Sequence, residues 1–245
     1  MNAAVFSPAD HQRDALAGHS RRVVVLPGLC APLHHKPALA TIAGFVRDTR
    51  PDALVLLHGP AGMDPAGRGA FGSVVADLRA AYPGMIGVYD CDPPYVAELA
   101  AWGVTVLPAT MELAPGWQAA QEIPTSTGGA TVASAEAAGA NLLCGGTGRL
   151  RLTGRADPAA DGGVRARLVF ECGTLAADPA AGTLGFGVLE TVGGTTNALP
   201  VQVGANGAFT HHGIRYMPPP DQAAGEAAGS SANSTSTVAR VSPAM

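Results

Sequence analysis

Short apolar runs alternate with helical patterns over the first half of the chain, and this alternation constrains the fold more than any other feature. Runs of four or five residues rich in Val, Leu and Ile predict buried strands, while the segments between them place apolar residues at helical spacing. The predicted strands are 23–27, 53–57, 85–89 and 104–107, and the predicted helices are 37–49, 73–82 and 94–102. Such alternation is typical of βαβ units and predicts a mainly parallel sheet.

The pattern changes near residue 140, after a predicted helix at 131–139. From there, apolar runs are separated by Gly, Asp-Pro and Asn-Gly turn signals and predict strands without intervening helices. The predicted strands are 141–144, 149–153, 164–172, 184–192, 199–203 and 208–216. The two halves together predict an α/β (α+β) fold, a four-layer αββα sandwich in which two mixed β-sheets pack face to face with helices outside.

The two ends of the chain differ from this central part. Residues 1–22 are expected to be an N-terminal extension with a short helix, because Ser7-Pro8 is typical of a helix start. Residues 23–216 form the predicted folded domain. Residues 217–245 contain three consecutive prolines followed by Ala, Gly, Ser and Thr, so they are predicted to be a disordered, low-complexity tail.

Five short segments follow predicted elements in a fixed order. They are Gly28-Leu29-Cys30, His58-Gly59-Pro60-Ala61-Gly62-Met63-Asp64, Tyr89-Asp90-Cys91-Asp92, Ala114-Pro115-Gly116-Trp117 and the run NLLCGGTGR at 141–149. In this order they resemble the motifs of calcineurin-like metallophosphoesterases, in particular the forms common in actinobacteria and their phages. The resemblance covers residues 23–216 and implies the same αββα sandwich.

The motifs of that family carry the ligands of two metal ions, and most of the ligand types are missing here. The family has Asp-x-His after the first strand, Gly-Asp-x-x-Asp after the second, Gly-Asn-His-Asp/Glu after the third, an isolated His, and a final Gly-His-x-His. By resemblance, the corresponding positions hold Gly28, Cys30, Pro60, Asp64 (one residue out of register), Asp90, Cys91, Asp92, Gln121, Gly146 and Gly148. Of these, Asp92 alone fits its place in the motif.

The loss of these side chains bears directly on catalysis. A two-metal phosphoesterase needs a bridging carboxylate and several imidazoles to hold two cations about 3.5–4 Å apart and to generate a hydroxide nucleophile. Gly and Pro offer no side-chain donor, so the preferred interpretation is a pseudo-enzyme that serves in binding, scaffolding or assembly. Such a protein would need no cofactor and would bind a protein partner or self-assemble.

Two catalytic alternatives remain open. In the first, two thiolates at neighbouring strand ends join a His and carboxylates to hold one Zn ion. The residues available for such a site are Cys30, His58, Asp64, Asp90, Cys91 and Asp92. In the second, a divergent metal-dependent phosphoesterase using Zn or Mn draws ligands from elsewhere, such as His34 and His35, although an exposed loop pair is the simpler interpretation of these two histidines.

Three other patterns invite a functional interpretation. Gly67-Arg68-Gly69-Ala70-Phe71-Gly72 is a literal GxGxxG, yet it begins well after the preceding strand ends, so a Gly-rich loop is preferred to a nucleotide site. His211-His212 falls on the last predicted strand, where alternation predicts one inward and one outward ring and no ligand site. Trp117 is expected to pack in the core.

Composition and charge exclude some function classes. A net charge of -4 with a single lysine, Lys36, argues against a nucleic-acid partner. No apolar run approaches the roughly 20 residues that a membrane helix needs, so no membrane partner is expected. Four cysteines scattered at 30, 91, 144 and 172 do not predict a disulfide framework, which favours a cytoplasmic location, or the virion if the chain is phage-encoded.

Overall fold

The structure is a computed structural model that describes residues 21–60, 62–89, 95–108, 111–119, 135–136, 138–145, 147–158 and 164–220. The predicted N-terminal helix and all of the predicted tail beyond residue 220 lie outside this part of the chain. The same is true of most of the helix predicted at 131–139.

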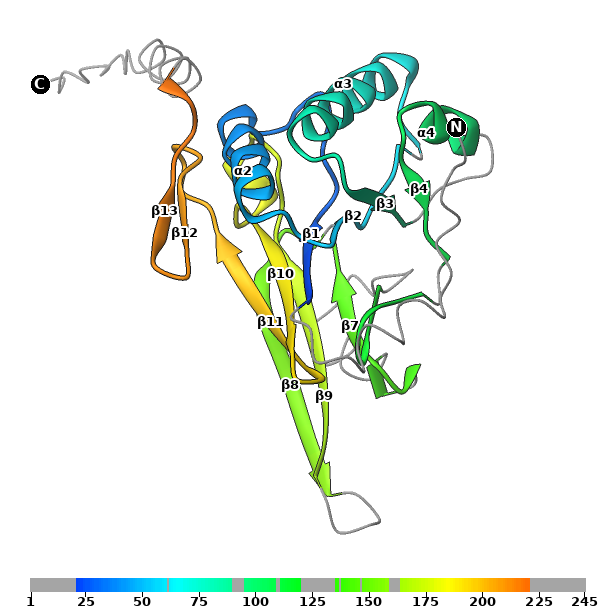
Figure 1. The fold of residues 1–245 in the computed structure, drawn as a ribbon, viewed down its shortest axis with the longest axis vertical. Coiled ribbons are helices and arrows are strands. Elements are labelled where there is room, and N and C mark those ends of the chain that lie inside the picture. The colour runs from blue at the N-terminus through cyan, green and yellow to red at the C-terminus, as the bar shows by residue number, and fades with distance from the viewer. Residues whose placement is uncertain are drawn as a thin grey trace, which may run out of the picture.

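A six-stranded mixed sheet forms the centre of the fold (Figure 1), in the order β11-β10-β1-β2-β3-β4. Its parallel half consists of β1 (Arg21–Leu26), β2 (Ala53–Leu56), β3 (Met85–Val88) and β4 (Thr105–Val106). Two antiparallel strands, β10 (Gly185–Val192) and β11 (Thr195–Gln202), extend it beyond β1. The parallel half confirms the βαβ interpretation, and β2 is buried along its whole length, as an inner parallel strand should be.

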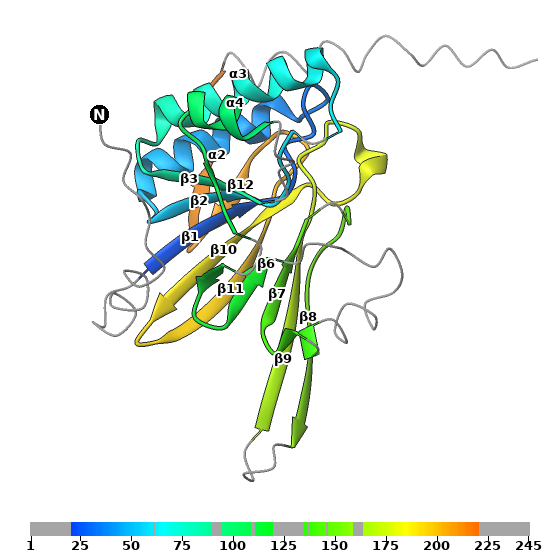
Figure 2. The ribbon, with the colours of Figure 1, turned by 90° about the vertical axis from the view of Figure 1, so that its right-hand side faces the viewer.

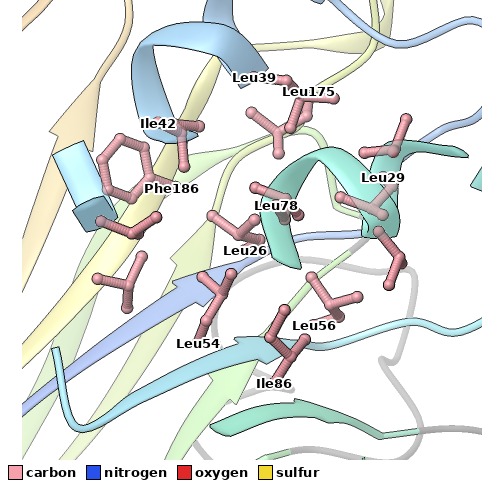
Figure 3. Packing of buried hydrophobic residues seen from close by; sticks show 14 of the residues in the cluster. Leu26, Leu29, Leu39, Ile42, Leu54, Leu56, Leu78, Ile86, Leu175 and Phe186 are labelled. Atoms are coloured by element: carbon pink, nitrogen blue, oxygen red, sulfur yellow. The ribbon is translucent and has the colours of Figure 1, made fainter. Parts of the chain in front are cut away.

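Three helices cover one face of this sheet, as Figures 1 and 2 show: α2 (Lys36–Thr49), α3 (Pro65–Ala81) and α4 (Val96–Ala101). The N-cap side chains of His35 and Asp64 accept hydrogen bonds from the first turns of α2 and α3, and a proline follows each cap. The core beneath these helices is drawn in Figure 3. Its labelled side chains include Leu39, Ile42, Leu78, Leu26, Leu54 and Leu56.

A second, five-stranded sheet packs against the other face, in the order β5-β6-β7-β9-β8. Its strands are β5 (Glu112–Ala114), β6 (Trp117–Ala119), β7 (Asn141–Cys144), β8 (Leu150–Pro158) and β9 (Val164–Cys172). Trp117 and Phe170 of this sheet and Val25 of β1 belong to one buried core cluster that both sheets share. The buried Trp117 is a packing residue, as predicted.

The outer face of the second sheet carries a smaller cluster in which Ala135 covers Leu142, Cys144 and Val169. Ala135 and Glu136 are helical, so the layer order is helix, sheet, sheet, helix. The predicted αββα sandwich of two mixed sheets is confirmed, and in the described ranges its last layer consists of this short helical segment. The architecture is the one that the resemblance to metallophosphoesterases implies.

The start of α3 differs from the prediction. The helix begins at Pro65 instead of residue 73, because Asp64 caps it and Pro65 occupies its first turn. The GxGxxG run at 67–72 therefore lies within the helix and forms no phosphate-binding loop before it. At Gly72 a Cβ atom would lie 2.7 Å from the ring of Trp102, so the glycine allows α3 and the residue after α4 to approach closely.

The second half of the chain contains further differences. The single strand predicted at 208–216 is a hairpin of β12 (Phe209–His211) and β13 (Ile214–Tyr216), and the paired strands β5 and β6 were not predicted. The 3-10 helix η2 (Pro179–Ala181) lies between β9 and β10. The β8–β9 hairpin is longer than predicted and projects past the rest of the second sheet (Figure 1).

The β12–β13 hairpin lies beside α2 (Figure 1) and is joined to it by aromatic side chains. The ring centroid of Phe45 is 5.5 Å from that of Phe209, 5.0 Å from that of Tyr216 and 5.2 Å from that of His211. These contacts place the end of β12 over the edge of the main core. Among the described residues, no helix is both long and apolar enough to cross a bilayer.

Candidate functional site

The first candidate site lies where β1 and β2 end, at the edge where ligands commonly bind in open α/β sheets. His58 follows β2, and its ring lies beside two glycines from different segments. A Cβ at Gly28 would lie 3.4 Å from the His58 Cβ, and a Cβ at Gly145 would lie 2.9 Å from Cδ2 and 3.0 Å from Nε2 of the ring. The imidazole therefore occupies the space that a side chain at position 145 would need, whereas a Cβ at position 28 would be in ordinary contact with His58.

Cys30 lies nearby, with its thiol in a local set of contacts. Its Sγ donates to the Gly28 carbonyl at 3.4 Å and lies 3.8 Å from the Thr174 hydroxyl oxygen. The backbone of Cys30 has a φ of 53°, a left-handed conformation that is uncommon for a residue with a side chain. This conformation sets the direction of the thiol at the end of β1.

Asp64 has a structural role in this geometry. Its Oδ1 accepts a hydrogen bond of 2.7 Å from the Gly67 amide, which makes the carboxylate the N-cap of α3. Pro60 is buried and has no side-chain donor. At Gly148, with φ of 66°, a Cβ would lie 2.2 Å from the Ala181 carbonyl oxygen, so the backbone itself excludes a histidine there.

The remaining positions of the predicted metal motifs lie outside the described residues. These positions are Asp90, Cys91, Asp92, Gln121 and Gly146. Among the residues that are described, Cys30, His58 and Asp64 do not form a group whose ligand atoms could share an ion. In the described part of this edge, His58 is a packed imidazole and Asp64 is a helix cap.

His34 and His35 were alternative ligands, and the structure gives them different environments. His35 is buried, contrary to the expected exposed loop pair: its Nδ1 accepts from the Ala38 amide and its Nε2 lies 3.0 Å from the Ala205 carbonyl oxygen. His34 lines a groove of about 840 Å³ between α2, α3 and residues 217–220. Burial and the nearby Lys36 lower the pKa of His34, while Asp77 acts in the opposite direction.

A second cluster lies at the opposite end of β1, where sequence reasoning predicted no site. Glu190, near the end of β10, lies beside His211 and His212 at the tip of the β12–β13 hairpin. The His212 Nε2 is 2.8 Å from Glu190 Oε2, and the His211 Nε2 is 3.5 Å from Oε1. Arg22 on β1 binds the same carboxylate, with its Nη2 2.7 Å from Oε1. The sequence pattern did not indicate that Glu190 and Arg22 lie beside the two histidines.

The electrostatics of this cluster favour an ionised Glu190 carboxylate beside a neutral His211 imidazole. Burial raises the pKa of Glu190, but hydrogen bonds from His212 and Arg22 outweigh burial, so its pKa lies below the usual range. Burial lowers the pKa of His211, and the neighbouring His212 lowers it further. One sequence signal for this geometry was available: Gly213 after the two histidines favours a turn over a continuous strand.

The remaining described thiols are buried. Cys144 and Cys172 lie in the second sheet, and burial raises the pKa of the Cys144 thiol to about 12 and that of Cys172 well above its usual value. High thiol pKa values disfavour the thiolate that binds metals or acts as a nucleophile. These two cysteines are therefore core residues, and Glu171 beside them pairs with Arg151.

The structure is therefore that of an α/β protein with two mixed sheets, in which His58 is closely packed at the edge where β1 and β2 end. No protein-family model matches the chain, and no curated protein matches it. Among solved structures, the crystal structure of Chaetomium thermophilum Vps29 is similar, with 11% sequence identity and a TM-score of 0.47, over 81% of this chain and 98% of that chain. The likeness at this level carries no argument about activity or partners.

Proposed function

We propose that the chain is a metallophosphoesterase-like protein that has lost its dinuclear metal centre and acts by binding, as a scaffold or structural protein. The observation that carries this proposal is the His58 ring packed beside Gly28 and Gly145, at the edge where the family would hold its ions. Gly28 offers no donor where the family has a carboxylate, and the His58 ring lies in contact with it. A protein partner or a second copy of the chain would then take the place of a substrate.

The competing proposal is a divergent metal-dependent phosphoesterase with a rebuilt Cys/His/Asp site that binds Zn or Mn. Cys30 and His58 are at the right edge for it, and Asp90, Cys91 and Asp92 follow β3, which lies beside β2. Asp64 would have to give up its hydrogen bond to Gly67 to join such a site. This cost favours the non-catalytic proposal.

Elemental analysis of the purified chain and of a Cys30→Ala, Cys91→Ala double variant tests the two proposals. The non-catalytic proposal expects the same metal content in both proteins and no hydrolysis of bis(p-nitrophenyl) phosphate with added Mn²⁺ or Zn²⁺. About one zinc per chain that is lost in the double variant, together with metal-dependent hydrolysis, would instead establish the rebuilt centre.

The cellular setting is part of the same proposal. A cytoplasmic location agrees with the three cysteines described as free thiols, and a virion-associated role would follow if the chain is phage-encoded. Light scattering coupled to size-exclusion chromatography tests self-assembly. A mass of one chain, 24.5 kDa, at all concentrations would leave a different protein as the partner.

A further inference from the structure

Glu190, His211 and His212 converge because of one turn. In an extended strand, consecutive side chains point to opposite faces. Here the φ of His212 is 48°, in the left-handed region, and the two ring centroids are 4.2 Å apart. His212 and Gly213, whose φ is 76°, form the two-residue turn of the β12–β13 hairpin, and this turn brings the two rings together.

His211 is the second, independent indication of a ligand. Its side chain is 7% exposed, and its Nε2 has no hydrogen-bond partner among the described residues. Glu190 Oε1 lies 3.5 Å away, longer than a good hydrogen bond. Because a buried ring nitrogen without a partner is unfavourable, a bound species at this position would satisfy it.

We propose that Glu190, His211 and His212 bind one divalent transition-metal ion, with Zn²⁺ as the ion whose preferences they match best. Two imidazole nitrogens and one carboxylate oxygen form a known zinc donor set, in which a fourth position stays open to water. The three ligand atoms all lie within 4.8 Å of one another. An ion bound at about 2.0–2.2 Å from each would replace the direct contacts between Glu190 and the imidazoles.

The surroundings of the cluster suit an open site. His212 is 55% exposed, so the fourth position faces solvent, while Phe45 packs against the His211 ring and fixes its orientation. Arg22 donates from Nε to Glu190 Oε1 at 2.8 Å, and such an outer contact orients a ligating carboxylate. The positive charge of Arg22 also opposes a cation, so we expect modest affinity.

This site is distinct from the lost centre of the proposed function. Cys30 follows the end of β1, whereas Arg22, the contact of Glu190, lies at its start. The donor sets also differ, because the strand-end alternative includes thiolates and the Glu190 cluster contains none. The two sites can therefore be separated by variant and by spectrum.

The test is titration of the metal-stripped full chain with Zn²⁺ by calorimetry, followed by Co²⁺ absorption spectroscopy. We expect one equivalent of Zn²⁺ to bind, and at least tenfold weaker binding in His212→Ala and in Glu190→Gln. Asp48→Asn, which changes an exposed carboxylate near the end of α2, is the control for Glu190→Gln and should bind as the unmodified chain does. Cobalt should give visible ligand-field bands without a thiolate-to-metal charge-transfer band.

Two outcomes would overturn the inference. One is the absence of saturable binding of Zn²⁺ to the unmodified chain. The other is binding that persists in His212→Ala and Glu190→Gln but is lost in the Cys30→Ala, Cys91→Ala variant, which would contradict the proposed non-catalytic function as well. Thermal unfolding of each variant checks that lost binding does not reflect lost folding, and the exposed His212 makes its alanine variant the decisive one.

Discussion

At the scale of single residues, close packing decides the environment of His58 at the strand-end edge. The missing side chain of Gly145 makes room for the His58 ring, and Gly28 lies in ordinary contact with the same residue. A histidine at such an edge looks like a ligand in the sequence. The structure instead makes it part of a close contact between the segment after β2 and the segment after β7.

We predict that Gly145→Ala destabilises the protein by about 1–3 kcal/mol. The new methyl group would lie 2.9 Å from His58 Cδ2 and 3.1 Å from Leu57 Cβ. Urea unfolding measures the loss, and His58→Ala in the same chain should reduce it. Gly69→Ala is the control, because nothing lies within 4 Å of that position on α3. Equal stability changes at both glycines would argue against a packed His58.

Tyr82 supplies a pH-dependent prediction. Its hydroxyl donates to the Pro51 carbonyl at 2.6 Å, and burial raises the pKa of Tyr82 to about 12. The unfolded chain releases this proton near pH 10, so the native state loses stability as the pH rises from about 10 to 12, by about 1 kcal/mol per pH unit.

Urea unfolding of the unmodified chain and of Tyr82→Phe at pH 9 and pH 11 tests whether Tyr82 causes this loss of stability. The variant should be less stable at pH 9, by roughly 0.5–1.5 kcal/mol for the lost hydrogen bond, and should depend less on pH. Burial raises the pKa of Tyr89 too, so some dependence should remain. An unchanged pH dependence in Tyr82→Phe would show that Tyr82 does not cause it.

At the scale of elements, caps and turns decide where functional side chains lie. With Asp64 as its N-cap, α3 begins eight residues before the predicted start, so the GxGxxG run is part of the helix. The turn at His212 and Gly213 divides a predicted strand into β12 and β13 and brings two histidines to Glu190. Both are local backbone features that hydrophobic periodicity does not report.

Variants of Asp64 can distinguish a role as the N-cap of α3 from the predicted role as a metal ligand. We expect Asp64→Ala to cost about 0.5–2 kcal/mol and Asp64→Ser to cost much less, because serine also accepts a hydrogen bond at an N-cap. Thermal or urea unfolding measures the difference. Metal content should be the same in all three proteins. Loss of bound metal in the serine variant, with its stability preserved, would show instead that the carboxylate is a ligand.

At the scale of the whole molecule, the two sheets share one core and should unfold together. Phe170 on β9 reaches the first sheet, where a Cβ at Gly187 would lie 2.7 Å from its ring. A single cooperative transition is therefore expected for the described domain, in calorimetry and in chemical denaturation.

Phe170→Ala should lower the free energy of unfolding by about 3–5 kcal/mol while keeping one transition, because its side chain is fully buried between the sheets. Leu152→Ala is the matched control: Leu152 lies directly opposite Phe170 in the β8–β9 pair but is 41% exposed. We expect it to cost less than about 1 kcal/mol. Two separate transitions in either variant would mean that the sheets fold as independent units.

Much of the architecture was determined by the sequence. Alternating strand and helix patterns up to residue 107 predicted the parallel strands, because burial on both faces requires continuous apolar runs. The strands at 141–144 and 164–172 were predicted with the observed bounds. The sequence also determined that Gly28, Pro60 and Gly148 have no side-chain donor, because no fold can add a ligand atom to these residues.

Only the tertiary structure decided which side chains meet. The β1–β10 register places Arg22 opposite Glu190, and the packing of Phe45 and the turn at His212 place His211 beside the same carboxylate. Likewise, His58 looks like a ligand until Gly28 and Gly145 are brought against its ring. Periodicity reports which face of an element is buried, whereas convergence of side chains depends on turns and on packing between elements, which local sequence does not encode.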